Sequence, residues 1–173
     1  MSVTTVEPDL DNLTLTVVAD FEASVEEVWE LWANSEKLGR WWGPPEYLTT
    51  FEPYDLSAGA EMAHVMTGPD GDKHEGVWRI EAVDPPRSLE LSDADVDEDG
   101  QPNDGLALTG MAMELSEHNG GTRMTVCSTF ISREGMEAMA EGFAEGLRLS
   151  LSRMETLLAE SRLASSIRFR RNR

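Results

Sequence analysis

Tryptophan is concentrated in one short stretch of the chain, where Trp29, Trp32, Trp41 and Trp42 lie within fourteen positions. Large aromatic side chains contribute much of the buried area of a core. The stretch ends in Trp-Trp-Gly-Pro, residues 41–44, and a proline after a glycine cannot continue a helix. The sequence therefore predicts helical structure that packs into a core and stops at a fixed corner.

Two short helices are expected around this corner. Ser24 and Glu27 have the spacing of a capping box, which places a helix start at Ser24. The apolar residues that follow recur at intervals of three and four: Val25, Val28, Trp29 and Trp32. A second short helix is expected from Ser35 to the Gly-Pro-Pro sequence at 43–45.

Strand patterns and turn residues alternate through most of the remaining chain. Residues 13–20 alternate with period two and predict the first strand. Turn sequences at 57–59, 68–71, 84–86 and 119–121 break the middle of the chain at hairpin spacing. These breaks predict an antiparallel meander with strands at 47–54, 60–67, 74–83, 87–93, 106–116 and 121–130. The acidic segment 93–105 is expected to be an exposed mobile loop.

The longest helical pattern covers residues 133–160. Its apolar residues recur every three or four positions: Met136, Met139, Phe143, Leu147, Leu151, Met154 and Leu158. Gly142 and Gly146 interrupt it, at a cost of about 1 kcal/mol each relative to alanine. We therefore expect a close backbone approach or a bend at these two glycines.

Length, charge and cysteine content limit the class of protein. A chain of 173 residues suits one domain, here 13–160, with an extension at 1–12 and a flexible basic tail at 161–173. Nine of the 14 basic residues and all 33 acidic ones lie in 1–161, a balance of −24 that repels nucleic acid and anionic membranes. The sequence has one cysteine and shows neither a secretory signal nor an apolar membrane span, so a cytoplasmic protein is expected.

Several motifs carry a family resemblance over about residues 13–160: Phe21 to Trp29, Leu38 to Pro44, Gly59 to Gly71, Glu81 to Leu89, Gly120 to Thr125 and the Met-rich last helix. They resemble the family named for the activator of the ninety-kilodalton heat-shock protein ATPase, within the START-like (SRPBCC) superfamily. The chain most resembles a bacterial single-domain branch grouped with a calicheamicin self-resistance protein. The resemblance implies an α+β helix-grip fold, with a curved antiparallel sheet of about seven strands around the long C-terminal helix.

That fold implies a cavity between sheet and helix, lined by apolar side chains. The candidate lining residues are Trp42, Met62, His64, Met66, Trp78, Met111, Met113, Met139, Phe143 and Leu147. Met62, His64 and Met66 share one face of their strand, and methionine suits an adaptable pocket. The expected function is noncatalytic binding of a hydrophobic or aromatic small molecule. The alternative for these residues is ordinary core packing.

Three other functions stay open at this stage. His64 is the candidate catalytic residue if the protein is a cyclase-like or hydrolase-like enzyme, although no partner that would complete a catalytic set is visible in the sequence. The resemblance also implies chaperone ATPase activation or self-resistance. The three histidines lack metal-ligand spacing, and neither a dinucleotide nor a phosphate loop is present, so no metal or cofactor is expected. A homodimer is an alternative to a monomer.

Overall fold

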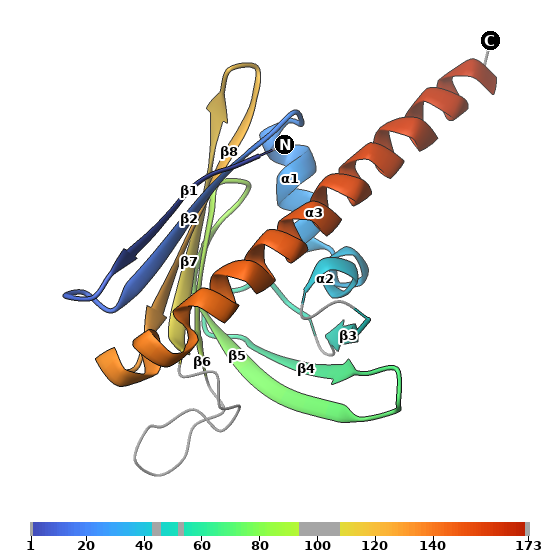
Figure 1. Cartoon of the computed structure of the whole chain (residues 1–173). Coiled ribbons are helices and arrows are strands. Elements are labelled where there is room, and N and C mark those ends of the chain that lie inside the picture. The colour runs from blue at the N-terminus through green and yellow to red at the C-terminus, as the bar shows by residue number, and fades with distance from the viewer. Residues whose placement is uncertain (1, 43–45, 52–53, 94–107, 172–173) are drawn as a thin grey trace.

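The computed structural model describes residues 2–42, 46–51, 54–93 and 108–171. It contains one curved antiparallel sheet of eight strands in the order β1-β2-β8-β7-β6-β5-β4-β3 (Figure 1). The strands are β1 (Ser2–Asp9), β2 (Thr14–Phe21), β3 (Leu48–Phe51), β4 (Glu61–Thr67), β5 (Lys73–Asp84), β6 (Ser88–Asp93), β7 (Leu108–His118) and β8 (Gly121–Phe130). With the long C-terminal helix and two short ones, this arrangement confirms the expected helix-grip fold.

The first helix begins where its capping box predicts. In α1 (Val25–Ala33), the Ser24 hydroxyl accepts from the Glu27 amide and the Glu27 carboxylate accepts from the Ser24 amide, which completes the capping box. Asn34 then ends α1 and caps α2 (Ser35–Trp41), because its side-chain oxygen accepts from the amides of Glu36 and Lys37. The third helix, α3, runs from Arg133 to Arg171.

The two short helices carry the chain across the sheet. Strand β2 lies next to one edge and β3 forms the other edge, so the connection between them spans the whole sheet. At its far end α2 packs against β3. A Cβ added at Gly39 would collide with the backbone carbonyl oxygen of Thr49. Glycine at 39 is therefore what allows this close approach of helix and strand.

The structure differs from the sequence-based expectation at both ends of the chain. Residues 2–9, expected as an extension, form an eighth strand paired with β2. Its register shifts between Val3 and Thr5, and this irregularity breaks the alternation that would have predicted a strand. At the other end, α3 continues to Arg171 through the segment expected as a flexible tail. The expected loop at 93–105 lies outside the described residues beyond Asp93.

The long helix crosses one half of the sheet. Its principal sheet contacts are with β1, β2 and β8, and it also meets α1 and α2. Its buried apolar face includes Met136, Leu151 and Met154. At Gly142 and Gly146 nothing lies within 4 Å of the position that a Cβ would occupy, so the close approach expected there is wrong. None of the described helices combines the length and apolar character that a membrane span requires.

We predict opposite stability effects for the same substitution in two helices. Gly142→Ala meets no obstacle and should raise the free energy of unfolding by up to about 1 kcal/mol, since alanine is the better helix former. Gly39→Ala should lower it by about 1–3 kcal/mol, because the added methyl group meets the Thr49 carbonyl. Urea denaturation followed by circular dichroism measures both. Equal effects of the two substitutions would contradict the close contact at Gly39.

Candidate functional site

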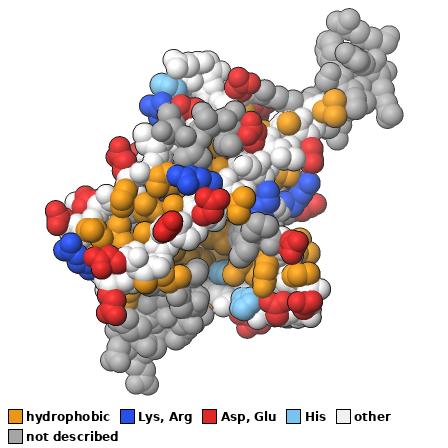
Figure 2. All heavy atoms as spheres, viewed as in Figure 1, with side chains coloured by type: hydrophobic (Ala, Val, Ile, Leu, Met, Phe, Trp, Pro, Cys, Tyr) orange, Lys and Arg blue, Asp and Glu red, His pale blue; other side chains and the backbone are white. Residues whose placement is uncertain are grey.

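The helix covers only part of the concave face of the sheet. While α3 packs on β1, β2 and β8, strands β4 and β5 curve away from it toward the opposite side (Figure 1). The space-filling view shows a hollow between α3 and this β4–β5 arm, with hydrophobic side chains at its depth (Figure 2). We call this hollow the sheet–helix hollow. It lies where the fold leads one to expect a ligand cavity.

Aromatic side chains from the tryptophan corner and the sheet form a continuous cluster at the β3–β5 side of the molecule. The ring of Trp42 meets Phe51 at 6.0 Å and Trp78 at 6.4 Å between centroids, both edge-on. Behind it Trp41 is buried, with its Nε1 donating to the Leu31 carbonyl oxygen at 2.8 Å. Edge-to-face pairs of this kind add about 0.5–1.5 kcal/mol each beyond area burial. The cluster therefore holds Trp42 in a fixed orientation.

His64 lies next to this cluster, on the inward face of β4. The register places it between Phe51 of β3 and Gly76 of β5. Its ring centroid is 5.7 Å from that of Phe51, and its Cε1 lies only 2.6 Å from the position of a Cβ built on Gly76. The imidazole therefore lies across the glycine, and only 6% of the residue is exposed. Gly76 creates the space that His64 occupies.

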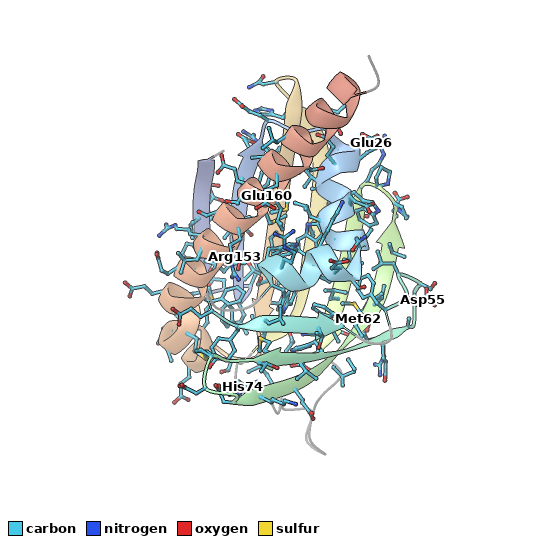
Figure 3. The ribbon with its side chains drawn as sticks, turned by 90° about the vertical axis from the view of Figure 1, so that its right-hand side faces the viewer. Glu26, Asp55, Met62, His74, Arg153 and Glu160 are labelled. Atoms are coloured by element: carbon cyan, nitrogen blue, oxygen red, sulfur yellow. The ribbon has the colours of Figure 1, made fainter. Side chains whose placement is uncertain are left out.

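The predicted lining residues fall into two groups by burial. Met62, His64, Trp78, Met111 and Met113 are buried on the sheet. Trp42, Met139, Phe143 and Leu147 are half-buried and pack against the core, and Met66 is half-buried on β4. Met62 and Trp78 are direct cross-strand partners, and Figure 3 shows Met62 on the inward side of β4. Phe143 packs edge-on against Phe130 at 5.8 Å. Phe143 thus meets the sheet at β8, whereas Trp42 meets it at β3 and β5.

Sequence reasoning missed Phe51, Tyr54 and Gly76. The Tyr54 ring packs on Phe51 at 5.9 Å and its hydroxyl donates to the carbonyl oxygen of Trp32. Burial raises the pKa of the Tyr54 phenol above its ordinary value. A glycine inside a strand often marks a close approach of another group, and this signal was available at Gly76.

A polar cluster occupies the exposed end of the β4–β5 arm. The Tyr47 hydroxyl donates to Asp72 Oδ2 at 2.7 Å, and His74 Nε2 lies 3.1 Å from the same oxygen (His74 labelled in Figure 3). The bond from Tyr47 lowers the pKa of Asp72, and the same bond raises the pKa of Tyr47. His74 is exposed, as predicted, and His118 is half-exposed at the end of β7. Within the described ranges, no three potential ligands among His, Cys, Asp and Glu converge to hold a metal.

Comparison with known proteins assigns the family. The model for "Activator of Hsp90 ATPase homolog 1-like protein" matches residues 22–159. The chain belongs to this family. A solved structure from Arthrobacter aurescens shares 40% identity with it, covering 92% of this chain and 93% of the other, at a TM-score of 0.81. A structure from Mycobacterium smegmatis shares 37% identity with this chain. The alignment covers 92% of this chain and 99% of the other, and its TM-score is 0.78. No curated protein matches the sequence.

More distant members keep the same fold. A protein from Nitrosomonas europaea is 22% identical and aligns at a TM-score of 0.76, covering 90% of this chain and 99% of its own. At this identity the likeness concerns the fold alone. The family model, which matches residues 22–159, confirms the family expected from the motifs, whereas the similarity to a calicheamicin self-resistance protein remains a prediction.

We predict that the effect of substituting Gly76 depends on His64. In the wild type, Gly76→Ala should lower the free energy of unfolding by about 1–3 kcal/mol, because the new methyl group overlaps the imidazole. In a His64→Ala background the same change should cost at least about 1 kcal/mol less, since the obstructing ring is gone. Denaturation of the four proteins in this double-mutant cycle measures the difference. Purely additive effects would show that the ring does not lie on the glycine.

Proposed function

We propose that this protein binds a hydrophobic small molecule in the sheet–helix hollow. The observation that carries the proposal is a set of half-buried apolar side chains: Trp42, Met139, Phe143 and Leu147 pack against the core, and Met66 lies on β4. Contact with a hydrophobic ligand would remove their remaining apolar surface from water, at about 25 cal/mol per Å². The hydrophobic depth of the hollow in Figure 2 supports the same conclusion.

The residues beside the hollow favour a ligand with an aromatic ring. The half-buried ring of Trp42, held edge-on by the buried Trp78, offers the offset and edge-to-face contacts that a planar ring prefers. Met66 and Met139 are flexible and polarizable, so they can adapt to an irregular outline. The imidazole of His64 adds one polar group to an otherwise apolar wall. A pocket of this composition typically fixes orientation through few polar contacts.

The other functions drawn from the resemblance remain predictions. Catalysis would use His64 as an acid or base, and the family description itself refers to activation of a chaperone ATPase. Both would need features beyond an apolar hollow, whereas binding follows from the lining side chains directly. We therefore favour binding.

We predict that filling the hollow weakens binding of a neutral hydrophobic dye. Leu147→Trp adds bulk on the face of α3 that packs toward the core, so it should weaken Nile red binding at least about tenfold. Leu149→Trp is the matched control, because Leu149 is 42% exposed and lies two residues away on the outward face of the same helix. Fluorescence titration of the wild type and both variants gives the Kd values.

Each outcome bears on the proposal. Unchanged dye binding by Leu147→Trp, or equal loss by both variants with unchanged melting temperatures, would exclude the sheet–helix hollow as the binding site. Native mass spectrometry of freshly purified protein complements the titration. A mass lost on denaturation would identify a copurified molecule, whose binding the same two variants then test.

A further inference from the structure

The end of α3 projects beyond the rest of the molecule. Figure 1 shows its last turns standing clear of the sheet and of α1 and α2. Ten residues, 162–171, extend a helix by about 15 Å, and in this segment Leu163 is 63% exposed. Short helical segments without packing are marginal in water. A partner that covers this segment would stabilise it.

A groove lies directly beside the start of the projecting segment, where α1, α2 and α3 meet. We call it the acidic groove; its volume is about 500 Å³. Its floor is apolar, since Leu31, Leu157 and Leu158 are all buried. The remaining lining residues are mostly charged: Glu26, Glu27, Glu30, Lys37, Arg40, Glu160 and Ser161. Figure 3 looks onto this side, with Glu26 on α1 and Glu160 on α3.

The groove carries excess negative charge. Lys37 approaches Glu30 at 3.9 Å, and Arg40 pairs with Glu160 at 3.1 Å. Four carboxylates thus share two basic side chains. Glu26 and Glu27 also lie in the first turn of α1, where they face the partial positive charge of that helix. The groove therefore suits a segment that combines positive charge with apolar side chains.

The end of α3 has this composition. Between 162 and 171 the sequence has no acidic residue and four arginines, at 162, 168, 170 and 171, together with Leu163, Ile167 and Phe169. Because α3 is continuous and leads away from the groove, this segment cannot enter its own groove while it stays helical (Figure 1). Nucleic acid and anionic membranes are disfavoured partners, since the balance of −24 over residues 1–161 repels both.

We propose that the acidic groove binds the basic end of α3 from a second copy of this chain. The contact is reciprocal, because an antiparallel pair of α3 helices related by a two-fold axis near Leu163 sets 166–171 of one copy beside 155–160 of the other. Leu157, Leu158 and Glu160 of the groove lie in the latter range. Each copy thus supplies one basic segment and one acidic groove.

Charge reversal on either surface tests this pairing. The tail variant carries Arg168→Glu, Arg170→Glu and Arg171→Glu, and the groove variant carries Glu26→Lys and Glu30→Lys. Sedimentation velocity at about 100 μM detects any dimer with a Kd in the micromolar range. The wild type should sediment at twice its chain mass of 19.2 kDa. Each variant alone should be monomeric, because its reversed surface repels the unreversed partner surface.

A mixture of the two variants provides the decisive test. In the mixed dimer, the acidic tail of the tail variant meets the basic groove of the groove variant, and the basic tail of the groove variant meets the acidic groove of the tail variant. An equimolar mixture should therefore recover the dimer. A monomeric wild type, a dimer that survives either reversal, or a mixture that stays monomeric would each overturn the proposal. Far-UV circular dichroism and thermal melts of each variant establish that loss of the dimer is not loss of folding.

Discussion

The tryptophan corner determines where the two halves of this molecule lie. Trp32 and Trp41 pack with ring centroids 4.7 Å apart, and Trp42 lies 5.7 Å beyond Trp41. These contacts fix the angle between α1 and α2, and α2 in turn delivers the chain to β3 at the far sheet edge. Because the meander then returns strand by strand to β8, the curvature of the β4–β5 arm and the hollow beneath α3 both depend on this corner.

The corner also links folding to the proposed function. Trp42 is the last aromatic residue of the corner and contacts Phe51 and Trp78 on the sheet. Trp41, its neighbour in sequence, is held in the core by the hydrogen bond that its Nε1 donates to the carbonyl oxygen of Leu31. Adjacent residues therefore serve different purposes: Trp41 anchors the helix pair, and Trp42 presents a half-buried ring next to Phe51 and Trp78.

Local patterns predicted most of the fold, because capping boxes, turn residues and apolar periodicity act over a few residues. The strand at Ser2–Asp9 was not predicted because Val3 and Val6 are at an odd spacing in the sequence, which breaks the period-two alternation. The pairing with β2 accommodates this spacing through a register shift. The sequence did not predict that α3 stays helical to its end, because the arginines there interrupt the pattern of apolar residues at helical spacing. At the site, period two correctly placed Met62 and His64 on one face. The contact of His64 with Gly76 depends on pairing between strands, which a single strand pattern does not contain.

The order of strands in the sheet also bears on how the chain is made. Strand β2 pairs on its inner side with β8, and the Thr122 hydroxyl donates to the carbonyl oxygen of Ala23, 99 residues earlier. On the ribosome, the inner edge of β2 must therefore stay unpaired until about three quarters of the chain has emerged. Contacts of such long sequence separation slow folding, and open strand edges invite association with other chains. Assistance during synthesis would have its greatest effect in this interval, before β8 closes the sheet.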